Sequence, residues 1–185
     1  QNVMTSVKRL LYGINISSYV TIEMEGVGKL TDLVGGVKLT CLEDIRVNKQ
    51  HVYKGQALTL KGKSALNYIT YRGEDLEANA RRMQRQKQFL SALMNQTGNA
   101  VINDFSRLAT FYGELSPYFS TNVSFAQITY LAQHCLTSNF GDTLEYKTID
   151  GTLSQGENWV EFTADEESLL DTVIDVFYTE KATTE

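Results

Sequence analysis

The stretch GVGKLTDLVGGVKLTCL, residues 26–42, contains the clearest change of secondary-structure signal in the chain. Apolar residues recur at helical spacing through its first half, and the pair Gly35-Gly36 ends that pattern. Glycine adopts positive φ angles at little cost, so it commonly follows the last turn of a helix. The residues that come next, 37–42, predict a strand.

The rest of the chain continues this alternation of helix and strand signals. Upstream, the sequence predicts a helix over residues 5–12, ended by Gly13, and a strand over residues 19–22. Downstream it predicts a polar loop over 43–59, a helix over 64–71, a charged loop over 73–79 and helices over 80–94 and 100–115. An extended segment at 118–121 and a helix over 125–136 come next, and a capping box of Ser124 and Gln127 begins that helix. Strands over 144–149 and 158–162 precede a last helix, which a capping box of Thr163 and Glu166 begins. The alternation indicates an α/β fold.

The composition is typical of one globular domain, with 42% hydrophobic and 21% charged residues among 185. Its charge is divided unevenly. Residues 1–96 carry 14 Lys/Arg and 8 Asp/Glu, whereas residues 97–185 carry 3 and 14, giving +6 and −11 and the net charge of −5. A basic first half can attract an anionic ligand, and an acidic second half argues against general nucleic-acid binding. Two solvated faces without a function would give the same division.

Two features that could suggest chemistry have simpler explanations. Residues 57–64 fit the loose form of a phosphate-binding loop, but a polar stretch precedes them where a buried strand is needed. A turn leading into the next helix is the preferred interpretation. The two cysteines, Cys41 and Cys135, have no metal-ligand spacing and are too few for a disulfide framework, so we interpret them as core or incidental residues.

A cluster of arginines marks the start of the helix predicted over residues 80–94. Arg82 and Arg85 lie three residues apart on one face, Gln86 is four residues from Arg82, and Arg81 adjoins them. Cations at a helix N-terminus oppose the helix dipole, so their concentration there favours an anionic partner. Guanidinium groups suit phosphate or pyrophosphate because they donate paired hydrogen bonds. A solvated basic face is the alternative.

Three segments in order resemble the LytR–CpsA–Psr family. The first is residues 11–20 followed by 26–37, and the second is Leu-Lys-Gly-Lys-Ser-Ala-Leu-Asn-Tyr at residues 60–68. In the third, the family has Arg-x-Arg, an acidic loop and Arg-x-x-Arg-Gln, where this chain has Thr-Tyr-Arg at 70–72 and Arg-Met-Gln-Arg-Gln at 82–86. The resemblance covers about residues 5–94 and is only general beyond residue 97.

The resemblance implies a three-layer α/β/α domain on the outer, extracytoplasmic face of a bacterial membrane. Such domains bind the polyprenyl tail of a lipid-linked glycopolymer in a hydrophobic pocket and transfer the polymer, as its phosphate, to a peptidoglycan hydroxyl. By position, the resemblance implies pyrophosphate contacts from four residues, namely Arg72, Arg82, Arg85 and Gln86. The residue pattern adds two candidate accessory residues, Arg81 beside the cluster and Asp75 in the charged loop, for which a solvated loop acid is the alternative.

The chain departs from the family pattern in two ways. The family's aspartates that bind Mg²⁺, a further arginine and a membrane helix are expected before Gln1, so we expect no metal ligands in this chain and incomplete catalysis by it alone. Thr70 stands at the first arginine of Arg-x-Arg and Asn79 where an acid is usual, which should weaken pyrophosphate and metal binding. We expect a LytR–CpsA–Psr-like part over residues 1–96 and a helix-rich extension over residues 97–185.

Three functions follow as alternatives. The first is a glycopolymer–peptidoglycan phosphotransferase, or the lipid-binding remainder of one. The second is a non-catalytic cell-envelope module that binds polyprenyl phosphates or wall polymers. The third, a transcriptional attenuator, is disfavoured by the acidic second half and the pI near 5.1. Self-association is also expected, because sheet edges left uncovered can pair with another chain.

Overall fold

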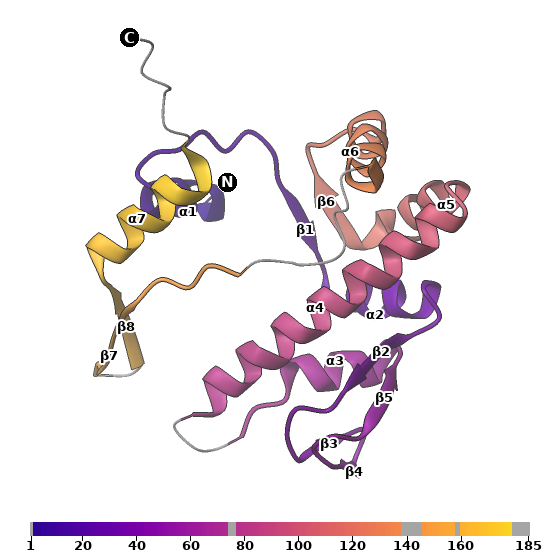
Figure 1. The fold of residues 1–185 in the computed structure, drawn as a ribbon, viewed down its shortest axis with the longest axis horizontal. Helices are drawn as coiled ribbons and strands as arrows, with labels where there is room; N and C mark the ends of the chain where they lie inside the picture. Colours follow the sequence, from indigo (N-terminus) through magenta and orange to yellow (C-terminus); the bar gives the residue numbers. More distant parts are fainter. Residues whose placement is uncertain (1, 74–76, 138–145, 158–159, 179–185) are drawn as a thin grey trace. The chain divides into compact units, whose positions relative to one another are not determined.

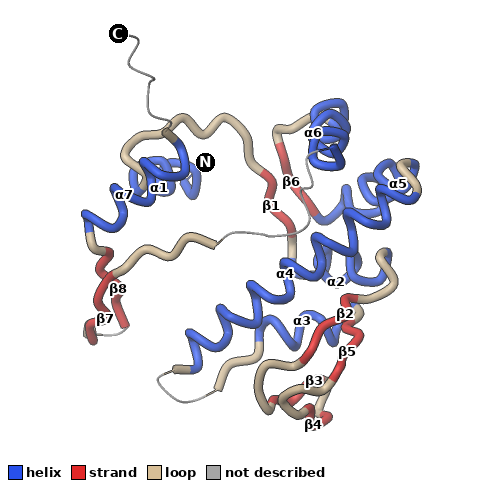
Figure 2. Tube along the Cα trace, viewed as in Figure 1, coloured by secondary structure: helices blue, strands red, loops and turns tan. Residues whose placement is uncertain are grey.

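The computed structural model describes residues 2–73, 77–137, 146–157 and 160–178 (Figures 1 and 2). The chain divides into two compact units. One unit combines Gln1–Tyr19 with Glu145–Glu185, and the other comprises Val20–Leu144. The arginine cluster lies in the second unit, which also contains most of the buried side chains.

The smaller unit combines the first helix with the last described helix and strands of the chain. Its elements are α1 (Asn2–Leu10), β7 (Gly151–Gln155), β8 (Val160–Ala164) and α7 (Glu166–Phe177). The turn after α1 has positive φ angles at Tyr12 and Gly13. The Tyr12 hydroxyl donates to the Glu166 carbonyl at 3.3 Å, which links α1 to the first turn of α7.

The larger unit contains most of the helices. They are α2 (Met24–Leu33), α3 (Gly62–Thr70), α4 (Ala78–Asn103), α5 (Ser106–Leu115) and α6 (Phe125–Thr137), with a short 3₁₀ turn, η1 (Ser116–Tyr118). After α2, Gly35 and Gly36 have φ angles of 83° and 103°. The double glycine therefore ends the helix as the sequence predicts.

The strands of the described residues form two-stranded antiparallel sheets. In the larger unit, β1 (Val20–Ile22) pairs with β6 (Phe119–Thr121), β2 (Val37–Thr40) with β5 (Ala57–Leu60), and β3 (Ile45–Val47) with β4 (Gln50–Val52). In the smaller unit β7 pairs with β8. The loop between β3 and β4 consists of Asn48 and Lys49, with φ angles of 50° and 68°. Positive φ at both positions is the conformation that the twist of a two-residue hairpin favours.

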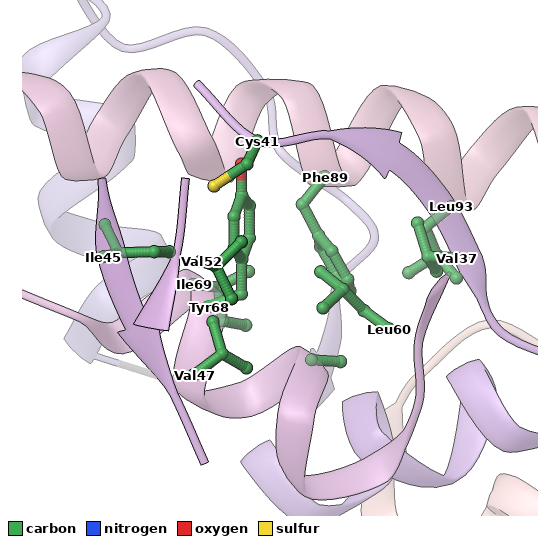
Figure 3. Close-up of a cluster of buried hydrophobic side chains, with 11 residues drawn as sticks. Val37, Cys41, Ile45, Val47, Val52, Leu60, Tyr68, Ile69, Phe89 and Leu93 are labelled. Atoms are coloured by element: carbon green, nitrogen blue, oxygen red, sulfur yellow. The ribbon is translucent and has the colours of Figure 1, made fainter. Parts of the chain in front are cut away.

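The main core lies between α4, α3 and the strands. Phe89 and Leu93 of α4 pack there, and Tyr68 of α3 is fully buried. Figure 3 shows the hairpin side chains of this core gathered around Tyr68. The buried members are Val37, Cys41, Ile45, Val47, Val52, Leu60, Ala65, Tyr68, Ile69, Phe89 and Leu93. A second cluster joins the end of α4 to α5 through Val101, Phe111 and Leu115.

Several predicted elements are wrong in position. The stretch 43–59, predicted as a polar loop, contains β3, β4 and the start of β5. The prediction failed because strands of three or four residues, interrupted by Lys, Asn and Gly, show little alternation of apolar and polar residues. The helix expected to begin at residue 100 is separated from its predecessor at Asp104, since α4 continues through Gly98. Near the end of the chain, the first strand lies at 151–155 rather than 144–149, part of which is outside the described residues. The last helix is capped by Asp165, which accepts from the Ser168 amide at 2.8 Å, and not by Thr163.

Other predictions hold. The first two helices, the strand ending at Ile22, the extended segment before residue 121 and the capping box of Ser124 with Gln127 are confirmed. The mixed α/β class is confirmed as well. The three-layer arrangement stays a prediction. The predicted division between residues 96 and 97 also stays a prediction. These residues lie inside α4, and the two compact units have other bounds.

Two glycines should respond oppositely to alanine. At Gly36, with φ of 103°, an added Cβ would lie 2.6 Å from Thr59 Cγ2, so Gly36→Ala should lower the free energy of unfolding by about 1–2 kcal/mol. Gly98 lies inside α4 with nothing within 4 Å of an added Cβ, and Gly98→Ala should raise it by about 0.5–1 kcal/mol. Urea unfolding of both variants measures the difference. Equal effects would contradict the role of Gly36 as a helix terminator.

Candidate functional site

The candidate site lies where α3 ends and the first turns of α4 run beside it. The last carbonyl groups of a helix have no partner within the helix and carry partial negative charge. Two side chains of α4 bind these carbonyls. Arg85 Nε donates to the Tyr68 carbonyl at 3.1 Å, and Gln86 Nε2 donates to the Ile69 carbonyl at 3.0 Å.

Arg85 is the most completely buried charged side chain described, with 1% of its surface exposed. Besides Tyr68, its guanidinium donates to the Tyr71 carbonyl and to a carboxylate oxygen of Glu43. It also lies over the Tyr71 ring, 5.3 Å from the centroid. A buried guanidinium needs this number of partners, because an unpaired charge inside a protein is strongly destabilising.

Glu43 bridges two of the arginines. One carboxylate oxygen pairs with Arg85, and the other accepts from Arg81 Nε at 2.8 Å. Arg81 also lies 3.6 Å from a Glu77 carboxylate oxygen, one helical turn earlier. Glu43 lies in the stretch that the sequence predicts as a polar loop, and it was not predicted as a site residue. Its partners lie 38 and 42 residues later, so no local pattern reveals them.

Arg82 has a different environment from its neighbours. Its NH2 group donates to Asn79 Oδ1 at 2.6 Å. Its Nε is buried and has no hydrogen-bond partner in the part of the chain that the structure describes. Buried donors are nearly always paired, so this N–H is suited to an acceptor supplied by a bound anion.

The remaining predicted residues lie around this cluster. Arg72 is exposed just beyond α3, and Asp75 falls outside the described residues. Thr70 is exposed, and its hydroxyl donates to the Leu66 carbonyl at 2.7 Å within α3. The structure therefore brings Arg81, Arg85 and Gln86 to internal partners. The roles of Arg72, Arg82, Arg85 and Gln86 as pyrophosphate contacts stay predictions.

The side chain of Tyr68, whose carbonyl binds Arg85, is fully buried and forms a polar pair with the half-buried Gln88. The Tyr68 hydroxyl donates to Gln88 Oε1 at 2.7 Å, and burial raises the pKa of this phenol to about 12. Burial also raises the pKa of the Cys41 thiol, whose Sγ lies 3.1 Å from the Glu43 carbonyl. Both groups are thus neutral and structural at neutral pH.

The described residues contain no group of three or more His, Cys, Asp and Glu side chains arranged to hold a metal ion. None of their helices has the length and apolar character of a membrane-spanning segment.

At the loose phosphate-loop match, the Gly62 amide donates to Thr31 Oγ1 at 2.8 Å and the Ser64 amide to the Lys61 carbonyl at 2.9 Å. Those amides are occupied within the fold. Residues 57–60 form β5 and α3 begins at Gly62, so the predicted turn is limited to the link at Lys61.

Comparison with known proteins agrees with the resemblance found in the sequence. The model of the LytR_cpsA_psr family matches residues 1–174. The chain belongs to the LytR–CpsA–Psr family. A relative from Oceanobacillus iheyensis, named polyisoprenyl-teichoic acid–peptidoglycan teichoic acid transferase TagU, is 32% identical over 112 residues, which cover 60% of this chain and 33% of that protein. The transferase TagV of Bacillus subtilis is 27% identical over 145 residues, which cover 74% and 37%.

Solved structures of LytR–CpsA–Psr proteins share the fold. The crystal structure of B. subtilis TagV has a TM-score of 0.74 at 24% identity and aligns with 94% of this chain and 69% of its own. A structure of TagT bound to LI-WTA has a TM-score of 0.69 at 19% identity, covering 92% and 63%. The chain spans about a third of the length of the curated relatives it matches.

Removing Glu43 should destabilise the protein. Glu43→Ala leaves the buried Arg85 without its counter-charge, and we expect a loss of about 3 kcal/mol in the free energy of unfolding. Glu114→Ala is the matched control, because its partner Lys29 is well exposed and surface pairs contribute about 0–1 kcal/mol. Urea denaturation of the two variants measures both values. A Glu43 effect as small as that of Glu114 would show that the bridge contributes little.

The buried phenol predicts a dependence of stability on alkaline pH. The pKa of Tyr68 is raised in the folded state from 10.0 to about 12, so the neutral form is favoured by folding. Its contribution is fully present below pH 10 and is lost as the pH rises toward 12, because the unfolded chain releases the proton first. Tyr68→Phe should flatten this part of the stability profile. An unchanged slope between pH 10 and 12 would exclude Tyr68 as its source.

Proposed function

We propose that this chain is the pyrophosphate-binding part of a cell-envelope glycopolymer transferase, and that the intact protein attaches a polyprenyl-linked glycopolymer to peptidoglycan. Membership of the family supports this, as do relatives named for the transfer of teichoic acid to peptidoglycan. The proposal places the protein on the extracytoplasmic side of a bacterial membrane, where lipid-linked polymer and peptidoglycan meet.

The observation that carries the proposal is the unpartnered, buried Nε of Arg82. It lies in the first turns of α4, beside Arg81 and close in sequence to the exposed Arg72. A pyrophosphate oxygen would accept from this N–H and neutralise part of the excess positive charge. Arg85 has no such capacity to spare, because its guanidinium is buried on Glu43 and two carbonyls.

The chemistry of such a transfer is one of charge neutralisation. A peptidoglycan hydroxyl oxygen would attack the phosphorus that bears the polymer, and the bridging P–O bond would break. Polyprenyl phosphate leaves, and the hydroxyl proton passes to a base. Arginine side chains favour the step by stabilising negative charge on the transferring and leaving oxygens. We expect Arg82 and Arg72 to supply that charge here.

Mg²⁺ is a separate expectation, drawn from the family. The described residues do not bring three potential ligands together, so they do not fit a magnesium site by themselves. Aspartates elsewhere in the parent protein would have to hold the ion. We therefore assign no step of the transfer to a metal bound by this chain.

The alternative of a non-catalytic binding module has one specific observation in its favour. Thr70 stands where the family has an arginine, and its hydroxyl is engaged within α3. A threonine donates one hydrogen bond without charge, which suits binding better than stabilisation of a leaving group. Transfer of labelled polymer to peptidoglycan by the full-length protein separates the two functions, since the module would bind without transferring.

Arg82→Ala tests the proposed site directly. We expect it to weaken binding of inorganic pyrophosphate about tenfold, because a charge-assisted contact is lost from a half-buried position. Isothermal titration calorimetry measures the affinity, and turnover of the full-length variant should fall in parallel. Arg107→Ala removes an exposed arginine of α5 and is the control for net charge. Equal affinities for the two variants would refute the assignment of Arg82.

A further inference from the structure

The β3–β4 hairpin has one buried and one exposed face. Ile45, Val47 and Val52 point into the core, as Figure 3 shows. The alternate positions Arg46, His51 and Tyr53 are exposed, as is Lys49 in the turn. We refer to these four exposed residues as the hairpin face. Because strand residues alternate, Arg46, His51 and Tyr53 lie on one side of the ribbon, and Lys49 lies at its tip.

Charge is concentrated along this part of the chain. Residues 45–73 contain six Lys and Arg and no Asp or Glu. The nearest preceding acid, Asp44, uses a carboxylate oxygen to accept from the Lys54 amide at 2.8 Å. Two of the six cations, Arg46 and Lys49, lie on the hairpin itself, which has no carboxylate in its own sequence. An anionic polymer would meet an attractive potential along it.

The hairpin face also carries an aromatic pair. The His51 and Tyr53 rings stack with centroids 5.2 Å apart and an interplanar angle of 29°. Tyr53 is 61% exposed, and Arg46 lies directly opposite His51 in the strand register. Flat rings offer an apolar surface to the C–H face of a sugar, and the adjacent guanidinium can bind a phosphate linked to it.

The hairpin is held in place before any ligand binds. Asn67 Nδ2 of α3 donates to Asn48 Oδ1 in the turn at 2.5 Å, and the core residues anchor the inner face. Its first strand begins two residues after Glu43, which joins the arginine cluster. A preorganised surface loses little conformational entropy on binding, which favours recognition by a few contacts.

We infer that the hairpin face is a docking surface for the glycan chain of an anionic, phosphodiester-linked glycopolymer. The inference rests on the proposed function for the identity of that polymer and adds a second binding surface to it. A membrane surface is the less suitable occupant, because the hairpin face has no aliphatic side chain to insert among lipids. The charged polymer would lie along this ribbon, with the Tyr53 ring against a sugar and Arg46 or Lys49 against a phosphate.

The test uses lipid-free poly(glycerol phosphate) as the probe and calorimetry at low ionic strength. Arg46→Ala with Lys49→Ala should weaken its binding about tenfold, and added salt should reduce the difference. Lys8→Ala with Arg9→Ala removes the same charge from exposed positions of α1 and should change binding less than twofold. For a glycosylated polymer of the same backbone, Tyr53→Ala should weaken binding and Tyr53→Phe should retain it.

Three results would overturn the inference. These are equal losses in the two double variants, no loss in the hairpin variant, or loss of binding to phosphatidylglycerol vesicles with polymer binding intact. Inorganic pyrophosphate separates this inference from the proposed function. The hairpin variant should bind pyrophosphate normally, whereas Arg82→Ala should bind pyrophosphate about tenfold more weakly and bind poly(glycerol phosphate) normally.

Discussion

The buried guanidinium of Arg85 is the interaction on which this part of the molecule depends. Its burial is tolerated because Glu43, the Tyr68 carbonyl and the Tyr71 carbonyl satisfy it together. These partners come from the segment after β2 and from the end of α3, while Arg85 belongs to α4. One side chain therefore fixes the relative placement of three segments, since displacing any of them would leave a buried charge or carbonyl unpaired.

This interaction divides the arginines between two roles. The concentration of cations at the start of α4 opposes the dipole of that helix and favours an anionic partner. For Arg85 and Arg81 the partner is internal, namely Glu43 and, for Arg85, the carbonyl end of α3. Arg82 is left with a buried donor and no partner in the described residues. The internal anion thus holds the framework, and Arg82 is the arginine that the proposed function assigns to a ligand.

How much of this could be predicted from the sequence depends on the range of each interaction. Features set by neighbouring residues were predicted correctly, such as the end of α2 at Gly35 and Gly36, which have positive φ angles. The family was also predicted correctly, from the resemblance of three segments. The β3–β4 hairpin was missed because its strands are three residues long, too short for a pattern of alternation. The arginine cluster was predicted, but the distinction between Arg85 and Arg82 was not. It depends on Glu43, about forty residues away in sequence, and on which side chain packing buries.

Thr70 has a consequence for how a polyanion could be recognised here. Where the family's paired arginines would bind a pyrophosphate by a rigid fork, this chain keeps only Arg72 at the end of α3. Yet the stretch of residues 45–73 that ends beside it lacks any acid and carries five other cations. The close contact at residue 70 therefore lacks a charge, but the cations of residues 45–73 still give this stretch a positive potential. A diffuse field attracts a long polyanion more effectively than a small one, because each repeating phosphate adds to the interaction.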